Sequence, residues 1–376
     1  MKIALVSPYD FTWPGGVTAH ISQLSQQLII MGHQVKVMTP FTPARADSID
    51  QNLVQFGRTV PIPMGGSIAR ISLSVWLYRK VREFLTSEAF DIVHIHEPLT
   101  PFLPLAVLQS SKAVNIGTFH SNHGTDRWYR FSSPILKYWF NRLDGRIAVS
   151  DVAHRQVERF FQGNYQIIPN GIDLGFFGGQ INKIPKYDDG KINILFVGRS
   201  EKRKGVKYLV DAYSQLKWDF PNIRLIVVGP GHPDREVSRI VAERGLMDIE
   251  FEGPVSHSQL PMYYHTADIF CSPATGKESF GYVLLEAMAA GTPIVASDID
   301  GYSSIVQHDH QGLLVAPKNG KLLADSLALL INNPELAKRM GEAGKKEVQR
   351  YSWSHVARSV LDYYQLTLES TIGRTT

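Results

Sequence analysis

The chain has 376 residues, of which 44% are hydrophobic and 20% are charged. This composition excludes a disordered protein and leaves room for two domains, since a domain usually has about 100 to 200 residues. Lys and Arg (39) exceed Asp and Glu (35) only slightly, so overall charge does not indicate a nucleic-acid-binding protein. The single cysteine, Cys271, cannot form an internal disulfide, which favours a reducing, cytoplasmic location.

The N-terminal apolar run is too short for a signal peptide, because polar residues follow from Ser7 onward. No stretch approaches the roughly 20 apolar residues that span a bilayer. We therefore expect a cytoplasmic protein whose contact with a membrane is peripheral.

Short β-branched segments alternate with amphipathic segments of helical length, which is the pattern of a parallel α/β sheet. In the first half, we expect a strand at residues 3–7, a helix at 17–31 closed by Gly32, and a strand at 35–39. Further strands are expected at residues 91–96, 114–119, 146–150 and 166–169.

The alternation restarts after a polar stretch that ends at Gly190. Strands are expected at residues 192–197, 223–229, 249–252, 269–272 and 293–296, with a helix from Gly205. The predicted fold class is therefore α/β, with two Rossmann-like doubly wound parallel-sheet domains facing a central cleft. We predict an N-terminal domain at residues 1–170, a second domain at 171–350, and a C-terminal helix at 351–376 that packs back across the junction.

Ligands of such sheets bind beyond the carboxyl ends of the strands. The paired glycines Gly15 and Gly16 lie at such an end, between the first strand and the first helix. Glycines there let the backbone approach a phosphate or sugar closely and present the N-terminal amides of the helix to an anion. The alternative interpretation is a tight loop that needs glycine for a positive φ. The spacing is not GxGxxG and no acidic residue ends the second strand, which argues against a dehydrogenase.

A basic turn opens the second domain between the strand that ends at Val197 and the helix from Gly205. Arg199 and Lys204, as two fixed cations beside helix amides, suit a pyrophosphate that gains charge as a leaving group. The alternative is a solvated basic turn, and we assign Lys202 and Arg203 to that solvated part.

Two carboxylates flank a predicted helix start at residues 279–281. Glu278 precedes this start and Glu286 lies about two turns along the helix. They can accept hydrogen bonds from the hydroxyls of a sugar and of a ribose, while the free amides bind phosphate. In the alternative, Glu278 is a favourable helix-terminal charge and Glu286 a surface residue. Glu286, however, lies among apolar neighbours, where burial without a partner is costly.

Three histidines lie on or after predicted strands. His120 ends the strand at residues 114–119, where it either binds a ligand or is a structural histidine. His94 and His96 alternate on another strand. The spacing indicates no third ligand, so we do not predict a metal site.

An amphipathic helix with a basic outer face is expected near residues 73–84. Basic residues beside exposed aromatic residues can dock on anionic lipid, and the alternative is an ordinary core helix with a charged outer face. The apolar stripe consists of Leu73, Leu77, Val81 and Phe84, the aromatic residues are Trp76 and Tyr78, and the basic residues are Arg79, Lys80 and Arg82.

Jointly, these motifs resemble the retaining GT-B glycosyltransferases of family 4 over nearly the whole chain. Within that family the likeness is to mannosyltransferases that act on phosphatidylinositol. The motifs are residues 14–17, 94–98, 118–120, 147–150, 169–171, 198–199, 204–205 and 278–286, with 60–63 and 66–70 for the narrower likeness.

The resemblance implies a retaining hexosyltransferase that moves mannose from GDP-mannose to a phosphatidylinositol-like lipid, with no tightly bound cofactor and no obligatory metal. It also implies docking on the inner face of the cell membrane through the basic helix. Donor contacts are expected from Gly15, Gly16, Arg199, Lys204, Glu278, Ser279, Phe280, Gly281 and Glu286, and acceptor contacts from Tyr9, Arg70 and His120. The expected catalytic residues are His120, Arg199, Lys204 and Glu278.

Three alternatives remain open at this point. A family 4 enzyme can use a UDP-sugar and a soluble or different lipid acceptor. A sugar-nucleotide epimerase or a non-catalytic nucleotide-sugar-binding protein can have the same fold. The sequence leaves the nucleotide base, the sugar, the acceptor, the oligomeric state and the extent of domain closure undetermined.

Overall fold

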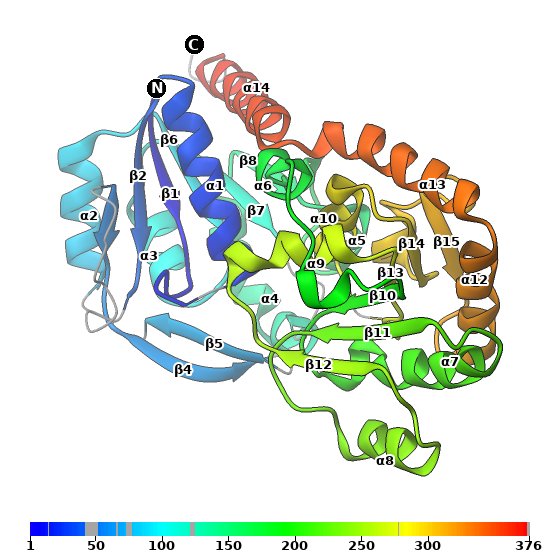
Figure 1. The fold of residues 1–376 in the computed structure, drawn as a ribbon. Helices are drawn as coiled ribbons and strands as arrows, with labels where there is room; N and C mark the ends of the chain where they lie inside the picture. Colours follow the sequence, from blue (N-terminus) through cyan, green and yellow to red (C-terminus); the bar gives the residue numbers. More distant parts are fainter. Residues whose placement is uncertain are drawn as a thin grey trace. The chain divides into compact units, whose positions relative to one another are not determined.

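The computed structural model describes residues 1–13, 15–41, 52–64, 67–72, 77–120, 125–276 and 278–373. The chain forms two compact units, each an α/β layer structure (Figure 1). Unit 1 contains Met1–Gly171 and Trp353–Thr376, and unit 2 contains Ile172–Ser352. Pro14, Gly66, Leu73 and Trp76, which belong to motifs named above, lie outside the described residues.

Unit 1 is built on a parallel sheet that, within the described residues, has seven strands in the order β3-β2-β1-β6-β7-β8-β9. This order runs outward in both directions from the first strand, as expected for a doubly wound sheet. The strands are β1 (Lys2–Val6), β2 (Gln34–Thr39), β3 (Leu53–Gln55), β6 (Ile92–His96), β7 (Val114–Phe119), β8 (Gly145–Ala148) and β9 (Gln166–Ile167).

Helices cover both faces of this sheet because alternate strand residues point to opposite sides. Ile3 and Leu5 pack with α1 and α14, whereas Ala4 and Val6 pack with α2, α3 and α4. The C-terminal helix α14 therefore completes unit 1, where it lies beside α1. The helices are α1 (Gly16–Ile30), α2 (Leu77–Glu88), α3 (Leu103–Ser110), α4 (Thr125–Phe140), α5 (Asp151–Glu158) and α14 (Trp353–Ile372).

Unit 2 repeats this architecture with a parallel sheet in the order β12-β11-β10-β13-β14-β15. On β10, Ile194 and Phe196 pack with α7, α8 and α12, while Leu195 and Val197 pack with α6, α9 and α10. The strands are β10 (Ile192–Val197), β11 (Ile223–Val228), β12 (Ile249–Gly253), β13 (Ile269–Ser272), β14 (Ile294–Ser297) and β15 (Gly312–Val315).

The connections of unit 2 are α-helices and short 3₁₀ turns. The α-helices are α6 (Leu174–Gly178), α7 (Val206–Asp219), α8 (Arg235–Glu243), α9 (Leu260–Thr266), α10 (Tyr282–Ala290), α11 (Asp300–Ser303), α12 (Gly320–Asn332) and α13 (Pro334–Glu347). The 3₁₀ turns are η2 (Pro185–Tyr187), η3 (Lys202–Lys204), η4 (His257–Gln259) and η5 (Val348–Tyr351). Among the described residues, no helix has both the length and the apolar character needed to cross a bilayer.

Sequence patterns missed β3, β15 and an antiparallel hairpin formed by β4 (Thr59–Met64) and β5 (Ser67–Ser72). Pro61 and Pro63 lie within β4, and prolines in a run argue against an interior strand. The hairpin stands apart from the parallel sheet and joins the loop after β1, since Tyr9 bridges to Ile71. It therefore places β5 beside a loop that follows a strand end.

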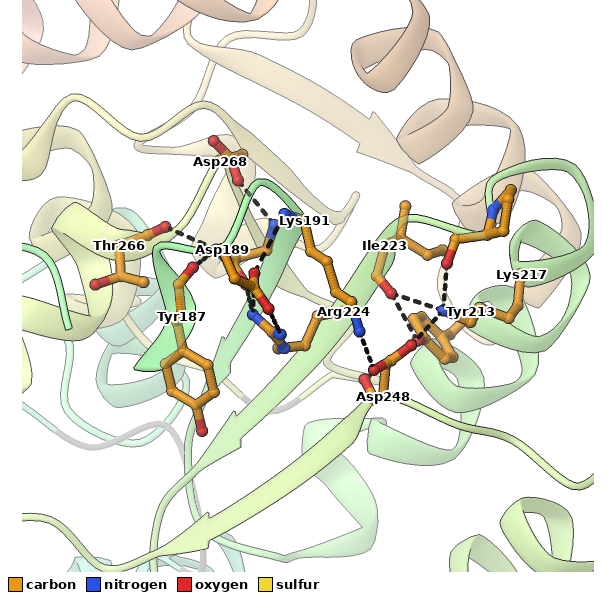
Figure 2. A network of polar contacts seen from close by, with 12 residues as sticks. Tyr187, Asp189, Lys191, Tyr213, Lys217, Ile223, Arg224, Asp248, Thr266 and Asp268 are labelled. Atoms are coloured by element: carbon orange, nitrogen blue, oxygen red, sulfur yellow. Dashed lines mark hydrogen bonds and ion pairs between the residues drawn. The ribbon is translucent and has the colours of Figure 1, made fainter. Parts of the chain in front are cut away.

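A polar network ties together the amino-terminal starts of β10, β11 and β12 (Figure 2). The Asp248 carboxylate accepts from the ammonium groups of Lys191 and Lys217, the latter at 2.8 Å. These two cations hold the pKa of Asp248 below its ordinary value. The Arg224 guanidinium donates to Asp189 at 3.1 Å. Because ligands of such sheets bind at the opposite strand ends, we assign this network to stability.

We expect Asp248→Asn to lower the free energy of unfolding by roughly 1 to 3 kcal/mol, because both lysines lose a charged partner. Urea unfolding measures this loss. Asp309→Asn is a matched control. Asp248 and Asp309 both have a positive φ (+60° and +63°), but the Asp309 side chain is 73% exposed. Equal stability of the two variants would contradict the assignment.

Candidate active site

A glycine-rich pocket opens at the carboxyl ends of β10, β11 and β12 in unit 2. Gly229 (φ +142°) lies so close to Gly198 that an added Cβ would come 2.0 Å from the Gly198 carbonyl oxygen. Only glycine permits this approach. The lining residues are Phe196, Gly198, Ser200, Val206, Val227, Gly229, Gly231, Pro233, Phe251 and Gly253.

Sequence reasoning identified Gly198 but missed the other glycines of this pocket. The available signal was a glycine at or just after the end of three neighbouring strands, at Gly198, Gly229 and Gly253. Together with the Phe196 and Phe251 side chains, these glycines give the pocket an apolar wall lined partly by backbone. Such a wall suits a flat heterocyclic ring.

The basic turn after β10 brings Lys204 to a carboxylate. Lys204 Nζ lies 2.8 Å from Glu278 Oε1, and both side chains are mostly buried. The assignment of Arg203 to a solvated turn is wrong, because its guanidinium also pairs with Glu278 and its Nε lies 2.7 Å from Glu201 Oε2. Lys202 is exposed, as expected, and Arg199 is exposed with a 3.7 Å contact to Glu201.

Gly205 makes this turn possible. It has φ +75° at the N-terminus of α7, and an added Cβ would lie 1.9 Å from the Pro273 carbonyl oxygen. The turn that carries Lys204 thus packs directly on the segment after β13. This close approach sets the position of Lys204 relative to residues that follow β13.

We expect Gly205→Ala to destabilise the protein more than Gly190→Ala and to weaken nucleoside diphosphate binding. Both substitutions carry the cost of positive φ, about 1 to 2 kcal/mol. Only Gly205→Ala adds a clash, since nothing lies within 4 Å of a Cβ at Gly190 (φ +85°). Urea unfolding and calorimetric titration with GDP measure the two effects. Equal losses in both variants would show that the close approach does not matter.

Glu278 and the helix start lie together, as expected, although α10 begins at Tyr282 rather than at residues 279–281. Its N-cap, Gly281, has φ +94° and no side-chain cap, so the first amides of α10 remain available to an anion. Phe280 is buried in the core of unit 2, which leaves its backbone rather than its ring for ligand contact.

Glu286 is a partly buried carboxylate rather than the surface residue of the alternative interpretation. Burial raises its pKa to about 7, although the Tyr264 hydrogen bond and the Lys204 charge oppose this rise. The Tyr264 hydroxyl donates to Glu286 Oε2 at 2.6 Å. Tyr282, one turn earlier on α10, has a buried hydroxyl with no hydrogen-bond partner among the described residues. Sequence reasoning missed both tyrosines.

We expect GDP affinity to rise with pH through about pH 7, because the ionised Glu286 carboxylate accepts hydroxyl hydrogen bonds more strongly than the protonated form. Calorimetric titration from pH 6 to pH 8 measures this dependence. Glu286→Gln is the control, since ionisation of the diphosphate itself affects both proteins equally. A variant with the wild-type pH dependence would contradict a role for this carboxylate.

In unit 1, the start of α1 is an uncapped helix N-terminus. Gly15 is extended (φ −164°, ψ 154°) and provides no side-chain cap. The positive-φ alternative is therefore not found at Gly15. The donor contact expected from Gly15 and Gly16 stays a prediction, and an uncapped helix start of this kind suits an anion.

The loop after β1 and the hairpin bring two predicted acceptor residues together. The Asp10 amide donates to the Arg70 carbonyl at 2.9 Å, and the Arg70 guanidinium lies over the Trp13 ring at 3.5 Å. Tyr9, next to Asp10, is mostly buried, and burial followed by the Glu97 charge raises the pKa of its phenol. The backbones of the two segments are thus adjacent, with the Arg70 guanidinium over Trp13 and the Tyr9 phenol interacting with Glu97 and Thr100.

His120, the third predicted acceptor residue, belongs to a buried group of histidines. Its amide donates to Glu97 Oε1 at 2.8 Å, and its Nε2 lies 2.9 Å from His96 Nδ1. His20 of α1 packs edge-on against His120, with ring centroids 4.7 Å apart. Burial, the largest cause, lowers the pKa of all three rings. His120 is therefore neutral and a weak base.

On α2, Leu77 and Val81 are buried as the stripe predicts, and Arg79 and Arg82 are exposed. Lys80 donates to the Gln55 carbonyl at 2.9 Å, so this ammonium is partly engaged. Tyr78 is half-buried against the core rather than exposed. The outer face of α2 thus carries three basic residues, of which Arg79 pairs with exposed Glu83 at 2.8 Å, and it contributes no exposed aromatic side chain among its described residues.

Comparison with known proteins identifies the family to which the chain belongs. The family model "Glycosyltransferase Family 4" matches residues 14–176, and "Glycosyl transferases group 1" matches residues 179–347. The phosphatidyl-myo-inositol mannosyltransferase of Mycobacterium leprae is 36% identical over 98% of this chain and 98% of that protein. The chain belongs to the family 4 glycosyltransferases. It is accordingly a hexosyltransferase.

Solved structures share the fold of this glycosyltransferase. Sucrose-phosphate synthase from Thermosynechococcus elongatus matches with a TM-score of 0.77 at 23% identity, over 98% of this chain and 99% of that chain. An Anabaena protein solved in complex with UDP matches with a TM-score of 0.77 at 18% identity, over 96% of this chain and 99% of that chain. The two parallel-sheet units are those of the GT-B fold.

Proposed function

We propose that this glycosyltransferase is a retaining mannosyltransferase that moves mannose from GDP-mannose to an inositol hydroxyl of a phosphatidylinositol lipid. The name of the M. leprae relative supports this acceptor and this sugar. The structural observation that carries the proposal is the Glu278 carboxylate held by Lys204 and Arg203 beside the open start of α10. This arrangement combines fixed cations and helix N-terminal amides, which suit a diphosphate, with a carboxylate that can accept hydrogen bonds from sugar hydroxyls.

Unit 2 binds the donor in this proposal. The base enters the pocket lined by Gly198 and Gly229, and the diphosphate lies against Arg199, Lys204 and the α10 amides. Glu286 accepts from the ribose hydroxyls, and Glu278 accepts from the sugar hydroxyls. Because Glu278 Oε1 is shared by two cations, its second oxygen is the one best suited to the sugar.

The transfer step is a same-face substitution at the anomeric carbon. The bond from this carbon to the departing phosphate oxygen breaks, the acceptor oxygen forms the new bond, and the acceptor proton passes to the departing phosphate. Lys204 and Arg199 stabilise the charge that develops on the diphosphate. These fixed cations supply what a divalent metal supplies elsewhere, so the proposed reaction requires no metal.

Unit 1 binds the acceptor. Arg70 suits a lipid phosphate, and Tyr9 and His120 suit inositol hydroxyls, because each offers a neutral hydrogen-bonding group. The neutral state of His120 fits a residue that orients a hydroxyl rather than an obligatory base. The amides at Gly15 and Gly16 offer a further anion contact to the donor.

The lipid acceptor requires docking on the inner face of the cell membrane. Arg79 and Arg82 on α2 are exposed and, with Lys80, suit anionic headgroups. On α4, Phe131 (82% exposed) and Ile135 (67% exposed) are one helical turn apart and present apolar surface. A basic face on one helix and an apolar face on another support peripheral association.

The test of this function is a transfer assay with the purified chain, phosphatidylinositol vesicles and radiolabelled GDP-, UDP- or ADP-sugars. We expect a mannosylated lipid from GDP-mannose alone, without added metal and with the anomeric configuration retained. Transfer from UDP-glucose to a soluble acceptor in place of the lipid would overturn the donor and acceptor assignments.

In the same assay, we expect Lys204→Ala to lower kcat by about 100-fold or more, the typical loss when a group stabilising the transition state is removed. Lys202→Ala is the matched control, because Lys202 is a neighbouring exposed lysine of the same turn. Because Lys204→Ala also removes the ion pair with Glu278, unfolding curves must show that both variants are folded under the assay conditions. Equal kcat values for the two variants would contradict the leaving-group assignment.

A further inference from the structure

Three buried histidines of unit 1 meet from separate elements. His20 comes from α1, His96 from β6, and His120 follows β7. One ring nitrogen of each lies within 4.8 Å of the others. Sequence spacing did not reveal this group, since the residues are 24 or more positions apart and only the packing of α1 on the sheet joins them.

We propose that His20, His96 and His120 form a binding site for a divalent transition-metal ion of the zinc class, and that an ion bound there inhibits glycosyl transfer. Three imidazoles with one open position form a known type of zinc site. The metal-binding part stands on the geometry alone, whereas the inhibition rests on the role proposed above for His120.

The hydrogen bonds around these rings prepare them as ligands. His20 Nδ1 lies 2.9 Å from Asn170 Oδ1, and because that amide oxygen only accepts, Nδ1 carries the proton and Nε2 keeps a free lone pair. Such orientation by a partner on the other ring nitrogen is typical of metal-binding histidines. His96 Nδ1 faces His120 Nε2, and His96 Nε2 is buried without a hydrogen-bond partner among the described residues, so neither nitrogen of His96 is held by a described residue outside the group.

Charge and protonation state also suit a cation. Burial keeps the three rings neutral, and the neutral imidazole is the form that binds metal. Glu97 is buried, and its Oε1 accepts from the His120 amide at 2.8 Å. This carboxylate supplies negative charge close to the site and offsets part of the cost of a buried dication.

The required movement is small for two of the rings. His96 Nδ1 and His120 Nε2 are 2.9 Å apart, and two nitrogens bound to one tetrahedral zinc at about 2.0 to 2.1 Å lie roughly 3.3 Å apart. Side-chain rotation must then bring His20 closer. His94 is not a ligand, because its two nitrogens contact Tyr364 and Thr118, each at 2.6 Å.

A bound ion would draw the His120 ring toward His20 and His96 and leave it unable to orient an acceptor hydroxyl. The metal therefore acts as an inhibitor rather than as a cofactor. This predicts that a chelator activates an enzyme that carries the ion, and that added zinc lowers turnover.

The test is a Co²⁺ titration of the metal-free full-length chain, followed by visible absorption and then by competition with Zn²⁺. We expect one Co²⁺ per chain, with the spectrum of a four-coordinate ion. His20→Gln should lose this spectrum, whereas His310→Gln should keep it, because His310 is an exposed histidine elsewhere in the chain. No such spectrum in the wild type, or an unchanged spectrum in His20→Gln, would overturn the site.

Two measurements keep the proposal testable if His20→Gln does not fold. X-ray absorption on the zinc-loaded wild type should show three imidazole nitrogens at about 2.0 to 2.1 Å, and fewer than three would overturn the site. Asn170→Ala should weaken zinc binding by roughly 10- to 100-fold, because it removes the partner that orients His20, and unchanged affinity would contradict this orientation.

Zinc titration of the transfer assay tests the inhibition. Turnover should fall over the zinc concentrations at which zinc displaces Co²⁺ from the site, and it should recover when a chelator is added. Undiminished turnover at saturating zinc would overturn the inhibitory role. A metal-free enzyme that transfers no mannose would count against the proposed function instead, and the Co²⁺ spectrum would still decide the metal site.

Discussion

The Glu278 carboxylate joins two segments that are 75 positions apart in the chain. Lys204 and Arg203 come from the turn after β10, and Glu278 precedes α10 in the connection after β13. Arg203 also pairs with Glu201 of its own turn, whereas Lys204 pairs with Glu278 across the two segments. Their ion pairs set the distance between the basic turn and the open start of α10. The glycine-lined pocket adjoins the same turn through Gly198, so the proposed donor site depends on this contact.

Glycine has a specific part in that arrangement. Gly205 and Gly229 both have positive φ, and each lies where a Cβ would meet a backbone carbonyl oxygen. The loops at the carboxyl ends of the strands can therefore pack against each other without side chains between them. Backbone amides and the ends of a few long side chains then form the surface. Such a surface suits a nucleoside diphosphate, which presents a flat ring and a line of charged oxygens.

The two units use polar groups differently. In unit 2, charged groups form ion pairs at both ends of the sheet, with the Asp248 network at the strand starts and the Glu278 pairs at the strand ends. In unit 1, the polar core residues at the ends of β6 and β7 are neutral histidines beside one buried carboxylate, Glu97. Neutral rings can hold a hydroxyl or a metal ion with little change in charge state. This difference matches the division proposed here between a charged donor and a lipid acceptor.

Local pattern in the sequence determined most of the parallel strands, the helix starts near Gly16 and Gly205, and the residue types around the proposed donor site. These features follow from the periodicity of apolar residues, from continuous apolar runs and from the positions of glycines. Each of these signals depends only on residues that are close together in the chain. The proline-containing hairpin was missed because its strands lie outside the parallel sheet, where the usual cost of proline does not apply. Only the tertiary structure decided that Arg203 pairs with Glu278, that Tyr264 holds Glu286, and that His20 joins His96 and His120. Each of these contacts links residues far apart in sequence, and no local pattern specifies which distant element will pack against which.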